Sequence, residues 1–414
     1  MPRTTERSNW VAARVDKTSD ALTRAIATDL TSHVFAAREG KEVILADGGR
    51  AVEFISCSYL GLDTHPALVD AAVATLRRVG VQFSSSRTRM RYEDLEALES
   101  LLGTIYGGRH ATCFTAVGSV HLGVLPLLGS GVLPSYPVAA NGVAFLVERT
   151  AHASLQVLRG VLEQIGTVDR FDCENPDDLA AKLAVIHGAG RTPVVLVDGV
   201  GSMGGLIDVR ALYELCAAAD GYLYVDDAHG VSITGAQGAG FAYEEFRDLP
   251  GGLPDSVIIV GSLAKAFGGS NGGFVVLNSE EDTVQLRKFG NPLIFGGPIA
   301  LPVVSACRVS AELHVDGTVA RLQQDLWRNT ELFDSRTGGA LFNAGTRSPI
   351  RGALFDREDD ALLAAGRLRK AGVIVTPAFF PTVAKGSGLI RMAVSAAHTA
   401  EQIELATNEL GVGA

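Results

Sequence analysis

Three polar residues that could do chemistry come directly after apolar segments of this chain. Lys265 follows the apolar run 256–260, while Asp226 and His229 follow the run 222–225. A lysine in this position is either an ammonium that reaches from a strand end into solvent or an amine that forms a Schiff base with a carbonyl group. Taken singly, an Asp before a turn and a lone His are typical of turns and helix caps.

The apolar runs are the elements that must position these residues. Between residues 53 and 290, short apolar runs alternate with helical stretches, a pattern that predicts an α/β fold with a mostly parallel sheet covered by helices on both faces. We expect seven strands in this sheet. Ligands of such sheets bind at the carboxyl ends of the strands, where Lys265, Asp226 and His229 are predicted to lie.

The sequence predicts three parts. Residues 1–48 form an N-terminal helical arm, because apolar residues between 10 and 38 fall roughly on one stripe. Residues 49–300 form the large domain, and residues 301–414 form a smaller C-terminal α+β domain.

Composition excludes several classes of function. The 414 residues are 47% hydrophobic and 20% charged, which is typical of a globular enzyme. The net charge of −10 and the absence of a basic block argue against a nucleic-acid partner. The apolar stretch 122–147 is interrupted by prolines and glycines, so we expect no membrane span. Five scattered cysteines without ligand spacing favour a reducing, cytoplasmic location and no metal site.

Together, the polar residues meet the needs of pyridoxal 5'-phosphate (PLP). This cofactor is an electron sink only while its pyridine nitrogen stays protonated, which requires a carboxylate beside it, and Asp226 is the candidate. The cofactor's 3-oxygen needs a hydrogen bond, for which His229 and Ser202 are suitable. His152 can cover the flat ring. Lys265 would then be the Schiff-base lysine.

The phosphate group needs hydroxyls and backbone amides near the start of a helix. Ser262 and the turn 115–119, which includes Gly118 and Ser119, offer such groups.

The chain resembles the α-oxoamine synthase family of fold-type I PLP enzymes, which are related to class II aminotransferases. The resemblance covers nearly the whole chain and rests on motifs in the family's order, at 59–62, 226–230, Lys265 and 391–399.

The resemblance implies a role for each matching residue. Lys265 is implied as the Schiff-base lysine, and Arg391 as the arginine that binds the substrate α-carboxylate. The other implied contacts are with the cofactor: the pyridine nitrogen for Asp226, the 3-oxygen for His229 and Ser202, the ring face for His152, and the phosphate for Ser262.

The activity that the resemblance implies is a decarboxylative Claisen-type condensation of an L-amino acid with an acyl-CoA thioester. The products are a 2-aminoketone, CO2 and CoA, and Lys265 is the general base. The family also implies a homodimer, and an acyl carrier protein is an alternative donor of the acyl group. Two other functions stay open: a PLP-dependent aminotransferase or aldolase on the same fold, and an inactive scaffold subunit, against which the presence of Lys265 argues.

Four segments depart from the family pattern. Residues 56–58 read Ser-Cys-Ser instead of Ser-Asn-Asp, and His121 stands in the turn region where relatives have an asparagine. Glycines replace hydroxyl residues at 296–297, and arginines at 87, 89 and 91 replace a glycine-rich turn. The arginines form either a face for a carboxylate or for CoA phosphates, or a solvated polar segment. From these changes we hypothesise a substrate other than glycine, with an acidic side chain.

Overall fold

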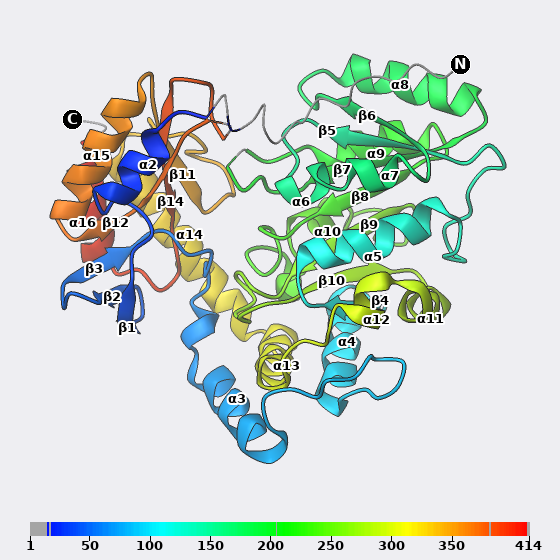
Figure 1. Ribbon diagram of the computed structural model, residues 1–414, viewed down its shortest axis with the longest axis horizontal. Helices are drawn as coiled ribbons and strands as arrows, with labels where there is room; N and C mark the ends of the chain where they lie inside the picture. The colour runs from blue at the N-terminus through cyan, green and yellow to red at the C-terminus, as the bar shows by residue number, and fades with distance from the viewer. Residues whose placement is uncertain (1–14, 16–17, 204, 381, 412–414) are drawn as a thin grey trace. The chain divides into compact units, whose positions relative to one another are not determined.

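The computed structural model describes residue 15 and the ranges 18–203, 205–380 and 382–411. The chain forms two compact units (Figure 1). The large unit is the continuous segment 57–326, whereas the small unit combines residues 1–56 with residues 327–414. Within the described part of the chain, no helix is both long and apolar enough to cross a membrane.

A seven-stranded sheet forms the centre of the large unit, in the order β4-β10-β9-β8-β7-β5-β6. Its strands are β4 (His110–Phe114), β5 (Val143–Glu148), β6 (Thr167–Phe171), β7 (Thr192–Asp198), β8 (Tyr222–Asp226), β9 (Val257–Ser262) and β10 (Gly273–Leu277). Strands β5 to β9 pair in parallel, and only β10 runs antiparallel to its neighbours in this sheet. Strands β7, β8 and β9 are buried along their whole length, as their apolar sequences require. The predicted mostly parallel seven-stranded sheet is confirmed.

Helices cover both faces of this sheet (Figure 1). One buried cluster contains residues of α4 (Glu93–Ile105), α8 (Pro176–Gly188), α9 (Val209–Ala217), α10 (Phe241–Glu244) and α13 (Leu301–Val315). The other contains residues of α5 (Val117–Gly129), α6 (Ala153–Gln156), α7 (Arg159–Leu162), α11 (Glu280–Phe289) and α12 (Asn291–Phe295). Helix α3 (Pro66–Val79) packs on α13. Two 3-10 turns, η1 (Leu62–Thr64) and η2 (Ala236–Gly238), complete the unit.

The small unit has its own core and two sheets. One sheet has the order β1-β2-β3-β12, and the other has the order β11-β14-β13. The strands are β1 (Phe35–Glu39), β2 (Glu42–Leu45), β3 (Arg50–Glu53), β11 (Ile350–Phe355), β12 (Val373–Ile374), β13 (Thr376–Ala378) and β14 (Gly388–Ala393), and the helices are α2 (Ala21–Ala27), α15 (Glu358–Lys370) and α16 (Ala400–Leu410). Helix α14 (Thr318–Arg336) contains the boundary between the two units.

The compact units differ from the predicted division into 1–48, 49–300 and 301–414. Residues 301–326 belong to the large unit, because α13 packs against α3 and α4. Residues up to 56 belong with the C-terminal part, because β3 pairs in parallel with β12. Of the predicted helical arm, the described residues form α2 and then the strands β1 and β2, while residues 1–14 and 16–17 lie outside the described part.

Candidate active site

Two carboxylates end neighbouring strands of the large sheet. Asp198 is the last residue of β7 and Asp226 the last residue of β8, and the two residues pair across the strands. Both are buried. Lys265 follows the end of the next strand, β9, by three residues and is half-buried. Lys265 and Asp226 therefore lie at the carboxyl ends of neighbouring parallel strands, as predicted, where ligands of such sheets bind.

The turn that carries Lys265 is held in place by close packing. The Gly268 N–H donates to the Lys265 carbonyl oxygen at 3.0 Å. Gly268 has a φ of +88°, and a β-carbon there would lie 2.6 Å from Leu62 Cβ, so only glycine fits. The next ring, Phe267, stacks on His314 of α13 with 4.6 Å between ring centroids. These contacts hold the backbone of Lys265, and therefore the base of its side chain, in a fixed position.

Asp226 is held by hydrogen bonds that favour its charged form. Its Oδ2 lies 3.1 Å from His121 Nε2, and its Oδ1 accepts from the Ala228 N–H at 3.1 Å. Burial by itself raises the pKa of Asp226, but the bond from His121 and the charge of Lys265 hold that pKa below its usual value. Asp226 is therefore an ionised carboxylate in an apolar setting, which is the partner that a protonated pyridine nitrogen needs.

His152 presents an accessible ring beside these groups. Its backbone N–H donates to both oxygens of Asp198 at 3.1 Å, and its Nδ1 lies 2.7 Å from Ser154 Oγ. Partial burial lowers the pKa of His152, the charge of Asp226 opposes this, and the charge of Lys265 lowers the pKa again. A neutral, exposed imidazole is suited to cover a flat aromatic ring.

Asp198 was not singled out as a site residue by its sequence, although it ends the apolar run 193–197. Burial first, and then the charge of Asp226, raise the pKa of Asp198 well above its usual value. The structure therefore shows two neighbouring carboxyl groups with opposite shifts. Asp226 stays ionised, whereas Asp198 favours its protonated form and fixes the backbone of His152.

His229 is buried, and its Nδ1 lies 2.8 Å from the hydroxyl of the fully buried Tyr59. Ser202 is half-buried in the segment that follows β7. Ser262, at the end of β9, is buried, and its Oγ accepts from the Ala264 N–H at 3.1 Å. All three predicted hydrogen-bonding residues thus lie in the large unit, at or just after strand ends.

The predicted phosphate turn is the start of α5. Gly118 and Ser119 lie in its first turn, where N–H groups precede the regular helical hydrogen bonds. Ser119 Oγ lies 3.2 Å from Thr115 Oγ1. A β-carbon on Gly118 would lie 3.6 Å from Ser154 Cβ, so this helix start is next to the segment that carries His152. Helix starts of this kind attract phosphate groups.

Arg391, the predicted carboxylate ligand, is in the small unit. It is buried on β14, opposite Gly352 of β11 and Thr376 of β13. Ser56, the first residue of the departing 56–58 motif, is in the same unit, where its hydroxyl donates to Glu53 Oε1 at 2.6 Å.

The three arginines at 87, 89 and 91 do not form one face. Arg87 is buried and donates to Glu99 and to the Cys113 carbonyl oxygen, and Glu99 also accepts from Arg287 at 3.2 Å. Arg91 pairs with Glu96 at 3.3 Å on the surface. Neither interpretation from the sequence is correct for Arg87, because its charge is neutralised inside the fold.

The glycines at 296–297 have a local structural cause. They follow the last turn of α12, where a β-carbon on Gly296 would lie 2.4 Å from the Pro292 carbonyl oxygen. Gly297 has a φ of +77°, in the left-handed region that favours glycine. The local backbone therefore favours glycine at both positions.

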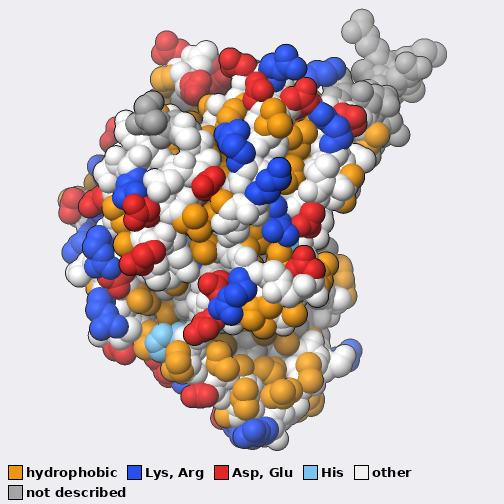
Figure 2. All heavy atoms as spheres, turned by 90° about the vertical axis from the view of Figure 1, so that its left-hand side faces the viewer, with side chains coloured by type: hydrophobic (Ala, Val, Ile, Leu, Met, Phe, Trp, Pro, Cys, Tyr) orange, Lys and Arg blue, Asp and Glu red, His pale blue; other side chains and the backbone are white. Residues whose placement is uncertain are grey.

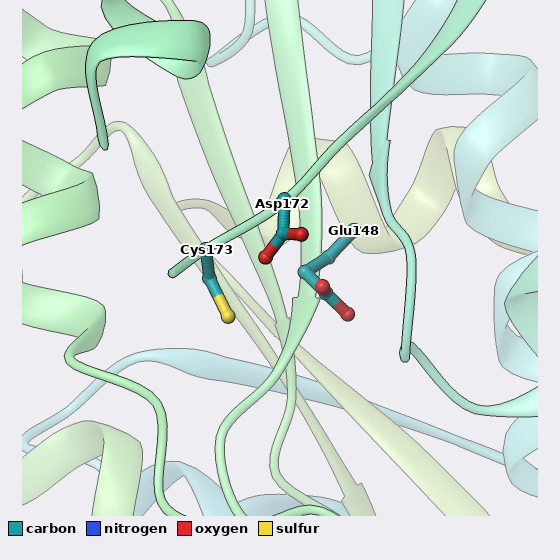
Figure 3. A group of neighbouring side chains, drawn as sticks. All are labelled: Glu148, Asp172 and Cys173. Atoms are coloured by element: carbon teal, nitrogen blue, oxygen red, sulfur yellow. The ribbon is translucent and has the colours of Figure 1, made fainter. Parts of the chain in front are cut away.

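A second group of polar side chains lies at the edge of the sheet. Figure 3 shows Glu148, Asp172 and Cys173, whose potential ligand atoms lie within 4.8 Å of one another. Glu148 Oε2 accepts from the Thr150 N–H and hydroxyl, and Arg149 lies 4.0 Å from Asp172. Burial, and then the charge of Glu148, raise the pKa of Cys173 to about 11, so its thiol stays protonated. We interpret the group as support for the turn after β5 and assign no ion to it.

Comparison with known proteins identifies the family. The model of the aminotransferase class I and II family matches residues 56–410. The 2-amino-3-ketobutyrate coenzyme A ligase of Salmonella typhimurium is 31% identical over 91% of this chain and 90% of that protein. The 8-amino-7-oxononanoate synthase of Pseudomonas putida is 31% identical over 90% of each chain. The structure of Sphingomonas wittichii serine palmitoyltransferase has the same fold, with a TM-score of 0.80, 22% identity and coverage of 99% and 97%.

The chain belongs to the α-oxoamine synthase family. Membership confirms the predicted fold-type I class and the prediction of a PLP-dependent enzyme of the acyltransferase type. The residues present fit this cofactor. A half-buried amine, an ionised carboxylate and an accessible imidazole follow or end the parallel strands β9, β8 and β5 of the same sheet, as an α-oxoamine synthase requires.

Proposed function

We propose that this chain catalyses the decarboxylative condensation of an amino acid with an acyl-CoA thioester, releasing CO2, CoA and a 2-aminoketone. The observation that carries the proposal is that Lys265, Asp226 and His152 lie together at the carboxyl ends of the parallel strands of the large sheet. Two relatives support it, because one is a 2-amino-3-ketobutyrate coenzyme A ligase and the other is an 8-amino-7-oxononanoate synthase.

Four residues of the large unit hold the cofactor in this proposal. When bound, PLP supplies an electron sink for the α-carbon of the amino acid. Asp226 keeps a proton on the pyridine nitrogen, because its own carboxyl group stays ionised. His152 covers one face of the ring, and His229 and Ser202 donate to or accept from the 3-oxygen. Tyr59 fixes the orientation of His229 through the bond at 2.8 Å.

Three further residues hold the phosphate group. The start of α5 offers the N–H groups of its first turn, with Gly118 leaving room for close approach and Ser119 adding a hydroxyl. Ser262 adds a second hydroxyl at the end of β9. Because these groups sit on ordered elements, they would hold the phosphate, and with it the ring, in a fixed position relative to Lys265.

Lys265 carries the proton transfers. Its Nζ would hold the cofactor covalently in the resting enzyme and would serve as the base once substrate is bound. The free amine then takes the proton from the substrate α-carbon and returns a proton after CO2 has left. Arg391 holds the substrate carboxylate through its two parallel N–H groups.

The amino acid is a finer part of the proposal. Residues 56–58 replace an amide and a carboxylate of the family pattern with Cys57 and Ser58, so we propose a substrate other than glycine. Arg87 takes no part in binding an acidic side chain, because Glu99 already neutralises it.

A matrix of amino acids against acyl-CoA thioesters tests the function. Release of free CoA thiol together with the mass of an aminoketone supports it. A keto acid without thiol would instead show an aminotransferase, and glycine as the only accepted amino acid would refute the finer proposal. Acyl groups on a carrier protein belong in the same matrix.

Lys265→Ala tests whether the protein is an active enzyme or an inactive scaffold. The wild type is expected to gain visible absorbance with PLP and to lose it on borohydride reduction, whereas the variant forms no bond that can be reduced onto the protein. Lys288→Ala, on the exposed face of α11, is the matched control and should behave as wild type. A wild type that stays colourless with PLP would contradict the proposed function.

We also propose a homodimer and a cytoplasmic location. Helix α3 exposes Val69, Val73 and Leu76 by 47%, 39% and 47%, at the spacing of one helical face. Figure 2 shows hydrophobic side chains gathered at the bottom of the view, where Figure 1 places α3. Such a patch is typical of an interface. Leu76→Glu should give monomers in sedimentation, unlike Val185→Glu on α8. The free cysteines favour a reducing compartment.

A further inference from the structure

His121 connects two residues of strand β8. It lies in α5 and is completely buried. Its Nε2 lies 3.1 Å from Asp226 Oδ2, and its Nδ1 lies 2.9 Å from the Tyr224 hydroxyl. Tyr224 and Asp226 are two residues apart on one strand, so their side chains point to the same face, where the imidazole bridges them.

The three groups have one arrangement that satisfies every buried hydrogen. Burial, and then the charge of Asp226, raise the pKa of Tyr224 well above its usual value, so its phenol keeps its proton. The phenol O–H donates to His121 Nδ1, which leaves the Nε2–H to donate to the Asp226 carboxylate. A proton on both ring nitrogens would leave the tyrosine hydrogen without this acceptor.

We propose that His121 is a positioning residue that orients Asp226 and keeps it ionised for the pyridine nitrogen, with Tyr224 fixing the tautomer of His121. The inference rests on the proposed function only in placing PLP at Asp226. In this chain the ring of His121 bonds both Asp226 and Tyr224, at the position where the family pattern has an asparagine. Asp226 is here oriented by a ring held from both sides.

Several charged or titratable groups act on this site together. Tyr224 and Asp226 come from β8, and Asp198 comes from β7. His152 precedes α6, and Lys265 follows β9; each interacts electrostatically with Asp226. The PLP affinities of the His121 variants are therefore compared with wild type at the same pH. Apart from Tyr224→Phe, each variant keeps all five of these groups.

The experiment measures PLP binding and its pH dependence, without substrate. Apoprotein is titrated with PLP by visible absorbance, and the pH at which the absorbance of the Lys265-bound cofactor changes is recorded. The variants are His121→Leu, His121→Asn and Tyr224→Phe. His187→Asn, on the partly exposed helix α8, is the matched control. Circular dichroism and thermal unfolding establish that each variant is folded.

His121→Leu should weaken PLP binding about tenfold or more, because a buried carboxylate loses a charged hydrogen bond. It should also move the absorbance change to higher pH, because less positive charge stays on the pyridine ring. His121→Asn keeps a donor and should bind PLP within about threefold of wild type. Tyr224→Phe should shift the absorbance change in the same direction but less.

Wild-type affinity and an unshifted absorbance change in folded His121→Leu would overturn the inference while leaving the proposed function intact. If that variant does not fold, an unshifted absorbance change in Tyr224→Phe would overturn it equally. If the wild type itself binds no PLP, the proposed function fails as well, so the two failures can be told apart.

Discussion

His314 gives the large unit a dependence on pH that can be calculated from its surroundings. The residue is completely buried in α13, with Nδ1 2.7 Å from the Ser310 carbonyl oxygen and Nε2 2.8 Å from Ser232 Oγ. The carbonyl can only accept, so Nδ1 carries the hydrogen and Nε2 accepts from the serine hydroxyl. The ring is therefore neutral, and it stacks on Phe267 in the turn that carries Lys265.

The sign and size of the effect follow from linkage. Burial lowers the pKa of His314 from 6.5 to about 4, although the bond to Ser310 acts in the opposite direction. Below pH 6.5 the unfolded chain binds a proton that the folded unit excludes, so stability is lost as the pH falls from 6.5 toward 4. When the pH falls from 7 to 5, this one group should lower the free energy of unfolding by about 2 kcal/mol.

The assay compares the wild type with His314→Gln. Hydrogen exchange of amide groups in β8 reports opening of the large unit separately from the small one. Other groups titrate equally in both proteins, so the wild type should lose about 2 kcal/mol more than the variant between pH 7 and pH 5. His187→Gln, on the surface of α8, should show the wild-type dependence.

Two results would refute the reasoning. The first is an equal pH dependence in the wild type and His314→Gln. The second, which needs no variant, is an NMR titration in which the His314 ring protonates near pH 6.5 in the folded protein. The expected signal is constant until the pH falls well below that value.

Three other changes have defined outcomes. Glu99→Gln should destabilise the large unit by about 3–5 kcal/mol, seen as a lower urea midpoint, because Arg87 is left buried without a carboxylate; an unchanged midpoint would contradict this. Gly296→Ser should cost about 1–3 kcal/mol in thermal unfolding, since its β-carbon would collide with the Pro292 carbonyl oxygen, and full stability would show that α12 can adjust. Asp198→Asn should change stability by less than about 1 kcal/mol, because the carboxyl group favours its neutral form, and a larger loss would mean that it is ionised.

The positions of Lys265 and Asp226 could be predicted because their signals are local. Each follows an apolar run long enough to cross a buried sheet, and parallel strands bring their carboxyl ends together. The sequence therefore indicated both where these strands end and that their ends lie side by side. His152 was found in the same way, because it follows the strand that ends at Glu148.

The supporting contacts could not be predicted, because they join residues far apart in the sequence. His121 and Asp226 are separated by 105 positions, and Tyr59 and His229 by 170. A histidine in an apolar helix looks the same whether it packs or bonds to a carboxylate. The burial of Arg87 is equally invisible, since it depends on Glu99 in a later helix.

A smaller C-terminal domain was predicted, but its pairing with residues from the start of the chain was not, for a reason of chain topology. Its sheet joins β3 to β12 through the pairs Val52 with Val373 and Glu53 with Ile374. Nothing in the local pattern of either segment indicates a partner more than 300 residues away in the chain. The predicted boundaries followed the order of the chain, whereas the compact units follow these pairings.

The assembly of the small unit from both ends of the chain has a consequence for synthesis on the ribosome. Residues 57–326 are continuous and can fold as soon as they emerge, because every strand of their sheet is then present. Strands β1 to β3 can pair with one another early, yet β12, the second neighbour of β3, is translated more than 300 residues later. One edge of β3 therefore has no partner through most of translation, and during that interval this edge is the part of the sheet most in need of a chaperone.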